Sequence, residues 1–310
     1  MTRIALATCA KLPDLNDDDA PLVAALAERG VTAEAAVWDD ASIDWAQYDL
    51  VVIRSTWDYA QRLTEYLEWA RRVDVTTRLA NPYPVLSWST DKHYLRDLES
   101  VGVPVVPTMW LEPARAFTSQ ALHTRFPALG EFVIKPAISA GSIDTGRYTA
   151  RDADSRGLAI RHARRLLAAQ RTVMVQRYLP SVDTVGERAH VFVAGEYSHS
   201  VLKGALLDGP DVGAEGVYRQ ERLTSLEASE REVEFSAQVV RAARTCFSRT
   251  VDGVELAPDP LLYARVDVVT DDTGAPVLME LELVEPSLFL GRADGALDRF
   301  ADAVAARATD

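Results

Sequence analysis

The sequence has little cysteine and little histidine, and this limits the chemistry that it can carry. Its 310 residues include two cysteines, Cys9 and Cys246, and five scattered histidines. Two distant cysteines provide neither a disulfide framework nor a metal-binding spacing. No Ser–His or Cys–His arrangement indicates a covalent nucleophile. The composition therefore disfavours disulfide-stabilised proteins, zinc proteins and enzymes that form covalent intermediates.

Long apolar runs and an excess of positive charge are also missing. No stretch approaches the roughly 20 apolar residues that a membrane helix needs, and the first residues become polar too early for a signal peptide. The net charge is −13, which disfavours nucleic acid and anionic membranes as partners because acidic surfaces repel phosphate. We therefore expect a cytoplasmic protein with a small-molecule partner, and a homodimer stays open.

What is present is the composition of an ordinary globular protein, with 48% hydrophobic and 25% charged residues. The first 90 residues alternate strand-like and helix-like segments, which is typical of a parallel α/β sheet. They lack the glycine-rich motif of dinucleotide-binding domains. After the turn formers at residues 81–84, strands and helices follow in mixed order, which predicts α+β subdomains. We expect three units, at residues 1–90, 91–178 and 179–310.

Two strand-like segments near the C-terminus carry charged residues in alternation. The charged residues are Arg265, Asp267, Glu280 and Glu282. Turn formers separate the two segments, so we expect an antiparallel hairpin. Pairing of Thr270 with Val277 would bring the four side chains onto one patch, with Asp267 opposite Glu280. Opposed carboxylates repel each other and need a cation, and oxygen ligands without Cys or His favour Mg²⁺. The alternative is an ordinary hairpin with a solvent-exposed acidic face.

Five features follow one another along the chain. They are Lys92 at the start of a helix, Lys135 at the end of a strand before a loop of small residues, the strand end from Gln176 to Leu179, Lys203 before a loop at 206–220, and the acidic hairpin. This order resembles the ATP-grasp superfamily of carboxylate–amine ligases. The hairpin spacing is similar to that of the D-alanine–D-alanine ligase branch. The resemblance covers nearly the whole chain and implies an ATP-grasp fold with ATP and Mg²⁺ as cofactors.

The resemblance also implies roles for individual residues. For nucleotide binding it implies Lys92, Lys135, Ser139, Gly141, Ser142, Gln176, Leu179, Asp183, Glu187 and Lys203. Among these, the lysines are expected at the phosphates, the loop at 139–142 above them, Gln176 and Leu179 at the adenine, and Asp183 or alternatively Glu187 at the ribose. The implied metal ligands are Asp267, Glu280 and Glu282, and the implied catalytic residues are Arg265, Lys203 and Arg188. The loop at 206–220 is expected to close over the site.

The chain departs from the family pattern at two places. The family often has several glycines in the phosphate loop, whereas this chain has Gly141 alone there, and Glu282 stands where an asparagine is usual. Each implied residue, taken singly, is also compatible with a surface charge or a strand end, and residues 206–220 with a plain surface loop.

A polar segment that follows the strand at residues 50–54 is the predicted substrate site. It contains Arg54, Ser55, Thr56 and Asp58. Parallel sheets bind ligands at such strand ends, and these side chains could hold the ammonium and carboxylate groups of a small amino acid. Alternatively, the polar residues cap the next helix while Trp57 and Tyr59 pack. This segment and the stretch ARVDVV…MELELVEPSL resemble the ATP-grasp subgroup that contains O-ureido-D-serine cyclo-ligases.

The resemblance implies a ligase that activates a carboxylate as an acyl phosphate for attack by nitrogen. For the narrower subgroup, the expected reaction is cyclisation of O-ureido-D-serine to D-cycloserine, with release of ADP, phosphate, carbon dioxide and ammonia. Two alternatives stay open. A dipeptide or glutathione-type ligase would require a second amine, and a nucleotide-binding scaffold without catalysis is allowed by Glu282 and the single glycine of the loop.

Overall fold

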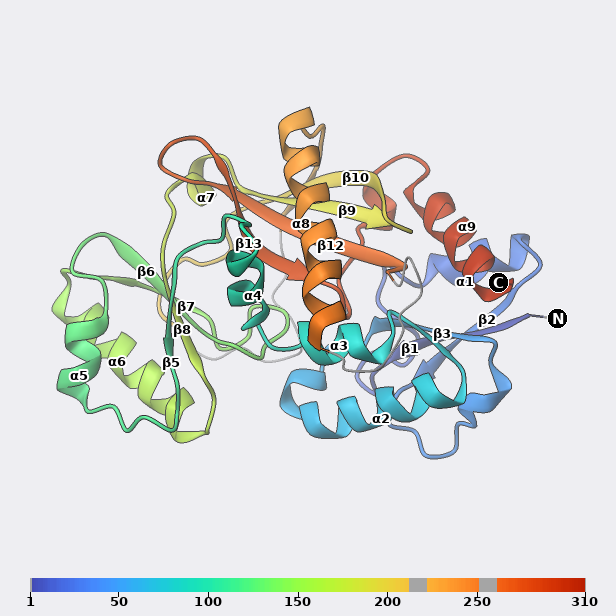
Figure 1. The fold of residues 1–310 in the computed structure, drawn as a ribbon, viewed down its shortest axis with the longest axis horizontal. Helices are drawn as coiled ribbons and strands as arrows, with labels where there is room; N and C mark the ends of the chain where they lie inside the picture. The colour runs from blue at the N-terminus through green and yellow to red at the C-terminus, as the bar shows by residue number, and fades with distance from the viewer. Residues whose placement is uncertain (1, 212–221, 251–260, 310) are drawn as a thin grey trace.

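The computed structural model describes residues 2–211, 222–250 and 261–309. Within these residues the strands form three sheets (Figure 1). A parallel sheet lies at one end of the molecule, a four-stranded antiparallel sheet lies at the other end, and a five-stranded antiparallel sheet lies between them. The predicted combination of α/β and α+β architecture is confirmed.

The parallel sheet has the strand order β2-β1-β3-β4. Its strands are β1 (Arg3–Thr8), β2 (Thr32–Val37), β3 (Leu50–Ser55) and β4 (Arg78–Ala80). All residues of β3 are buried, as expected for a parallel strand covered on both faces. The covering helices are α1 (Pro21–Glu28), α2 (Leu63–Thr76) and α9 (Ala296–Thr309). Helix α9 comes from the end of the chain and packs against α1.

The four-stranded antiparallel sheet has the order β5-β8-β6-β7. Its strands are β5 (Thr108–Leu111), β6 (Glu131–Pro136), β7 (Gly146–Thr149) and β8 (Val173–Arg177). Helices α5 (Ser119–Arg125) and α6 (Ala153–Ala168) cover one face with an apolar core that includes Phe132, Tyr148 and Leu166. The other face is left free to contribute side chains to a cavity.

The central sheet has the order β11-β10-β9-β12-β13. Its strands are β9 (Glu187–Val193), β10 (Glu196–Lys203), β11 (Leu223–Leu226), β12 (Tyr263–Thr270) and β13 (Pro276–Glu282). Helices α3 (Tyr83–Ser89), α4 (Tyr94–Ser100) and α8 (Glu230–Thr250) share an apolar core with one face, which includes Val266, Leu278 and Leu281. The opposite face carries the charged residues of the hairpin. The shorter elements are η1 (Trp45–Gln47), η2 (Tyr59–Gln61), α7 (Ser181–Thr184) and η3 (Leu290–Arg292).

The register of the β12–β13 hairpin differs from the prediction near its turn. Thr270 pairs with Pro276, so the predicted pairing with Val277 is wrong. A bulge at Met279 inserts one extra residue into β13, after which Asp267 pairs with Glu280 and Arg265 with Glu282. The side-chain pairs expected at the acidic patch are therefore confirmed, because the bulge shifts the register back by one residue.

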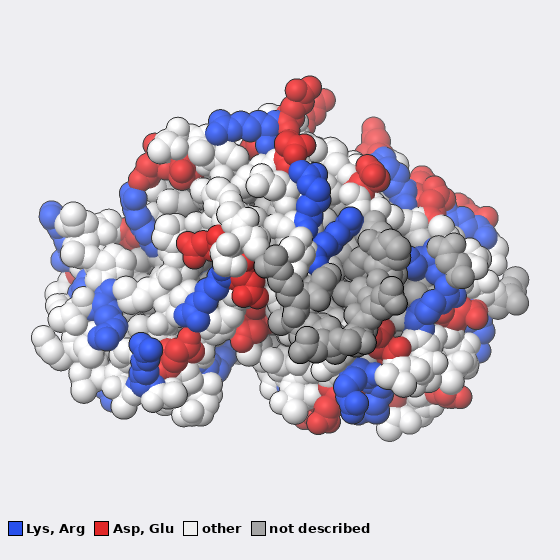
Figure 2. Space-filling model, in the orientation of Figure 1, with Lys and Arg blue, Asp and Glu red and all other residues white. Residues whose placement is uncertain are grey.

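Each sheet falls within one of the three predicted units, although the boundaries at residues 90 and 178 stay predictions. In the parts of the chain that the structure describes, no helix is both long enough and apolar enough to cross a membrane. Basic and acidic side chains are mixed over the face seen in Figure 2. The acidic excess of the chain is therefore not gathered into one patch on that face.

Candidate active site

A cavity of about 610 Å³ lies where the three sheets meet. Pockets for small ligands usually measure roughly 300–1,000 Å³. Its wall includes Trp57 and Tyr59 beyond the end of β3, together with residues of β6, β8, β10, β12 and β13. The predicted residues in the wall are Lys92, Lys135, Ser139, Gly141, Ser142, Gln176, Leu179, Glu187, Lys203, Arg265, Glu280 and Glu282. The fold thus brings together residues that are far apart in the sequence.

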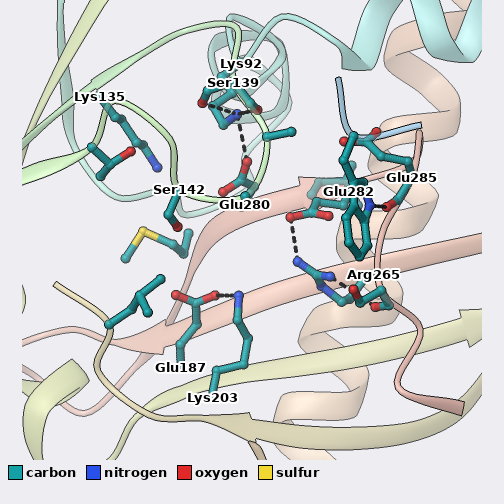
Figure 3. A pocket seen from close by; sticks show the side chains of 18 of the residues that line it. Lys92, Lys135, Ser139, Ser142, Glu187, Lys203, Arg265, Glu280, Glu282 and Glu285 are labelled. Carbon is teal, nitrogen blue, oxygen red and sulfur yellow. Dashed lines mark hydrogen bonds and ion pairs between the residues drawn. The ribbon is translucent and has the colours of Figure 1, made fainter. Parts of the chain in front are cut away.

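Two buried lysines approach the cavity from different elements (Figure 3). Lys92 precedes α4, and its Nζ donates to the Ser139 carbonyl oxygen at 2.8 Å and pairs with Glu280 Oε1 at 3.0 Å. Lys135 comes from β6, and within the described residues no ion pair or hydrogen bond engages its Nζ. Burial lowers the pKa of Lys135, and the nearby Glu280 carboxylate partly offsets this effect. Both ammonium groups therefore lie in a partly dehydrated site, where an anion would be held strongly.

The loop after β6 turns tightly beside these lysines. Gly141 and Ser142 both have a φ of 58°, in the left-handed region. Glycine adopts this conformation without steric cost. The loop side chains are small, and Ser139, Gly141 and Ser142 all line the cavity. The backbone can therefore come close to a bound group.

Arg265 is the centre of the charged patch on β12 and β13. Its guanidinium donates to both carboxylate oxygens of Asp267, at 2.8 and 2.9 Å, and to Glu282 Oε1 at 2.5 Å. Lys203 Nζ donates to Glu187 at 2.6 Å and to Asp267 at 3.1 Å. The Asp267 side chain is only 1% exposed, whereas those of Glu280 and Glu282 are 24% and 29% exposed. Two carboxylates therefore face the cavity, and the third lies behind them.

Burial and the surrounding charges give the three carboxyl groups different pKa values. Burial acts to raise the pKa of Asp267, but Arg265 and Lys203 outweigh it and hold that pKa well below its usual range. Lys92 and Lys135 likewise outweigh burial at Glu280 and lower its pKa. At Glu282 burial prevails over Arg265, and with Glu280 nearby the pKa rises to about 7. The patch therefore holds two firmly ionised carboxylates and one that binds a proton readily.

The described residues contain no preformed cage of three or more His, Cys, Asp or Glu ligands. Mg²⁺ does not require such a cage, because it keeps several waters and usually takes one or two carboxylates together with substrate phosphates. Glu280 and Glu282 offer hard oxygen ligands on the cavity wall. The donor set fits Mg²⁺ on these grounds. Asp267 already accepts hydrogen bonds from Arg265 and Lys203. Its role as a metal ligand therefore stays a prediction.

The opposite end of the cavity is less polar. Gln176, Tyr178 and Leu179 lie at the end of β8 and after it, and Met279 packs in the same apolar cluster as Leu179. The Gln176 amide donates to Thr108 Oγ1 at 2.8 Å, so its side chain is already engaged. No hydrogen bond involves the Leu179 backbone N–H within the described residues. This donor is free for a planar heterocyclic ligand.

Two predicted nucleotide contacts do not lie in the cavity wall. Arg188 follows Glu187 on β9 and points to the other face of the sheet, where it pairs with Glu232 and donates to Thr270. Successive strand residues alternate between faces, so the expectation that Arg188 faces the transferred phosphate is wrong. Asp183 accepts hydrogen bonds from Arg147 and Tyr178 outside the wall. Glu187, the alternative to Asp183, does line the cavity.

The prediction that the polar residues of the Arg54–Asp58 segment bind the substrate also needs correction. Arg54 is fully buried, its Nε donates to Asp19 at 2.8 Å, and its Nη2 donates to the Pro286 carbonyl at 2.7 Å. The other polar side chains of the segment are buried and bonded too: Ser55 donates to Asp19, Thr56 contacts the Tyr66 hydroxyl, and Asp58 accepts from Trp38. Protein groups already satisfy these side chains, so they are not free to bind a substrate.

The aromatic residues of the same segment lie in the cavity wall instead. Trp57 and Tyr59 line it, together with Asn16 and with Glu285, which follows β13. Sequence reasoning missed all four as site residues. Glu285 follows Leu283 and Val284 directly, and a glutamate in this apolar setting was a signal that could have been used. From the loop at 206–220, Leu206 and Leu207 line the cavity, whereas residues 212–221 lie outside the described part of the chain.

Comparison with known proteins places this geometry in a family. The family description for the N-terminal domain of D-cycloserine synthetase DcsG matches residues 4–81. The cycloserine biosynthesis protein DcsG of Streptomyces lavendulae is 40% identical over 308 residues, which cover 98% of each chain. The crystal structure of D-cycloserine synthetase DcsG superposes with a TM-score of 0.86 at 35% identity, covering 99% of both chains. A D-alanine–D-alanine ligase from Bacillus anthracis complexed with ATP has a TM-score of 0.66 at 14% identity, covering 100% of this chain and 98% of that one, and shares the fold.

The fold and the cavity define an ATP-grasp ligase, an enzyme that forms a C–N bond. The identity over nearly the whole length is more specific than the fold. The chain belongs to the D-cycloserine synthetase family.

Proposed function

We propose that this enzyme uses ATP and Mg²⁺ to activate the carboxylate of O-ureido-D-serine and closes that molecule into D-cycloserine. The single observation that carries the proposal is the cavity, in which Lys92, Lys135 and Lys203 face the carboxylates of the β13 strand. Membership of the D-cycloserine synthetase family supports the choice of substrate. The arrangement suits a reaction that transfers a phosphoryl group to a carboxylate.

Three features support nucleotide binding along the cavity. The buried ammonium groups of Lys92 and Lys135 would bind the phosphates as point charges, and the tight turn at Gly141 would let backbone N–H groups approach them. The free N–H of Leu179 would bind the adenine edge, and Glu187 would accept hydrogen bonds from the ribose hydroxyls. When bound, ATP supplies the phosphoryl group that makes the substrate carboxylate a good electrophile.

Glu280 and Glu282 would hold Mg²⁺ at the phosphate end of the cavity. Both side chains are partly exposed to it, and their oxygens are the ligands that Mg²⁺ prefers. In this role they would exchange their present partners, Lys92 and Arg265, for the metal. The released Lys92 and Arg265 would then be free to pair with phosphate oxygens and offset negative charge.

Ring closure would need little chemistry from the protein once the carboxylate is activated. The aminooxy nitrogen of the substrate, which carries the carbamoyl group, would attack the carbon of the acyl phosphate. A C–N bond would form, the nitrogen would lose its proton to solvent, and phosphate would leave with the C–O bonding electrons. Hydrolysis of the carbamoyl group then releases carbon dioxide and ammonia. The cavity walls would hold the two ends of the substrate close together and exclude water, which favours intramolecular attack over hydrolysis.

The test is an ADP-release assay with Mg²⁺-ATP and O-ureido-D-serine, in which the product is identified by mass spectrometry. We expect one ADP for each D-cycloserine, with no second amine required. ADP release that depends on an added amine would replace the proposal with an intermolecular ligase. Nucleotide binding without turnover of any small amino acid would replace it with a binding scaffold.

A further inference from the structure

Glu285 is a buried carboxylate in the cavity wall with no role assigned so far. It lies three residues after β13 and is 8% exposed. The neighbouring carboxylates on this wall have cation partners, since Glu280 pairs with Lys92 and Glu282 with Arg265. The Glu285 carboxylate has no ion pair and no hydrogen bond from another residue across the described parts of the chain. Lys92 and Arg265 favour its ionised form from a distance, but neither bonds to it, so an ionised Glu285 would lack a directly bonded cation.

Such an arrangement is costly unless a ligand completes it. An ionised carboxylate removed from water without a partner loses several kcal/mol of hydration or takes up a proton. Burial, followed by repulsion from Glu282, raises the pKa of Glu285 well above its usual value. A bound cation would reverse this effect by favouring the charged form. The wall around Glu285 is therefore suited to a positively charged group.

Two aromatic residues complete this part of the wall. The Trp57 indole N–H donates to the Glu285 carbonyl oxygen at 3.0 Å, which holds the ring beside Glu285. Tyr59 lines the same cavity, and the Glu285 charge adds to burial in raising the pKa of its hydroxyl. Aromatic faces attract ammonium groups. A carboxylate and aromatic rings in one cavity wall form a suitable receptor for a primary ammonium.

The position of this group relative to the phosphate end agrees with such a ligand. Lys135 and Glu285 are the two buried residues of the wall whose charged groups lack an ion pair or hydrogen bond to another residue in the described chain. Figure 3 shows them on different sides, with Glu280 and Glu282 between. A free cation at one end matches phosphate, and a free anion at the other end matches an amine.

We propose that Glu285, with Trp57 and Tyr59 in the same cavity wall, binds the α-ammonium group of the amino-acid substrate and selects for its presence. This inference rests on the proposed function and names the residue that reads one end of the substrate. Glu285 would then bind the ammonium group, a role that the sequence had predicted for the buried Arg54–Asp58 segment.

The test compares O-ureido-D-serine with an analogue in which hydrogen replaces the α-amino group. In the wild-type enzyme, we expect kcat/KM for the amino substrate to exceed that for the analogue by about 10- to 100-fold, as for a charge-assisted hydrogen bond. Glu285→Gln should bring this ratio close to one, mainly by raising the KM for the amino substrate. The KM for ATP should stay unchanged. Calorimetric Kd values for the two ligands give the same ratio if a variant turns over too slowly.

Asp17→Asn is the matched control, because it removes a carboxylate from the exposed rim of the same cavity. We expect this variant to keep the wild-type ratio, and circular dichroism should show that both variants are folded. A Glu285→Gln enzyme that keeps the wild-type ratio would overturn the inference and leave the proposed function standing. A wild-type enzyme with equal kcat/KM for the amino substrate and its analogue would also overturn the inference. A wild-type enzyme that does not turn over O-ureido-D-serine would instead refute the proposed function, and the inference with it.

Discussion

The Arg54–Asp58 segment and the β12–β13 hairpin look alike in sequence, because each places charged residues at or beside apolar strands. In the structure they differ in exposure. Arg54 and Asp19 form an ion pair in which both side chains are 0% exposed, whereas the Glu280 and Glu282 side chains keep about a quarter of their surface open to the cavity. The first cluster joins parts of the fold, since Arg54 also donates to the Pro286 carbonyl.

The difference shows that a charge after a strand does not by itself indicate a binding site. The polar atoms of the buried cluster have protein partners on all sides. The hairpin carboxylates have protein partners on one side, and a ligand can approach from the other. Breaking the buried cluster should therefore cost stability, whereas changing the hairpin should cost activity.

The largest expected effect comes from Glu280→Gln. This substitution removes a charge that is proposed to bind Mg²⁺ while keeping the size of the side chain. We expect ADP release with O-ureido-D-serine to fall by about 1,000-fold, comparable to the loss of a key electrostatic contact in other enzymes. The thermal unfolding midpoint should stay near that of the wild type. Normal turnover in this variant would contradict the metal assignment.

Arg54→Ala should act on stability instead. It leaves the Asp19 carboxylate buried without its partner, which typically costs about 3–5 kcal/mol. Urea unfolding measures this loss. Arg3→Ala serves as the control, because the Arg3–Glu34 pair has side chains that are 41% and 48% exposed and should contribute at most about 1 kcal/mol. If Arg54→Ala unfolds like the wild type and instead raises the KM for substrate, the segment is a substrate site after all.

Glu282→Gln should change how the stability of the nucleotide-free and metal-free enzyme depends on pH. Burial raises the pKa of Glu282 from 4.5 to about 7 in the folded state, so the folded protein holds this proton more tightly than the unfolded chain. The resulting stability is fully present below pH 4.5 and is lost as pH rises through 7. Relative to wild type, the variant should therefore gain at least about 1 kcal/mol between acid and neutral pH. If the free energies of unfolding of the variant and the wild type changed with pH in parallel, that result would contradict the raised pKa of Glu282.

Much of the fold could be predicted from local patterns. The strand at Arg3–Thr8 follows from a short apolar run. The helix predicted from Leu63 to Val73 follows from a helical pattern, and in the structure it runs to Thr76. Short elements such as β4 (Arg78–Ala80) and β7 (Gly146–Thr149) were missed. Three or four residues carry too little periodicity to be recognised, and such strands form because a neighbouring strand offers them hydrogen bonds.

The candidate site was only partly predictable, because strand phase depends on pairing. Glu187 and Arg188 are adjacent, yet Glu187 faces the cavity and Arg188 faces α8. Nothing in two successive charged residues says which one faces which side. That choice was made by the pairing of β9 with β10 and β12, which places Glu187 opposite Lys203.

The order and type of the charged residues indicated the chemistry without any coordinates: lysines ahead of an alternating acidic hairpin indicate phosphate and a hard cation, since charge and ligand type are local properties. Which charges stay open to a ligand was decided by the packing. Arg54 donates to Asp19 and to the Pro286 carbonyl, whereas the Glu285 carboxylate lies in the wall without a bonded partner among the described residues. Exposure and partnership depend on residues that are distant in the chain, so only the assembled fold could assign them.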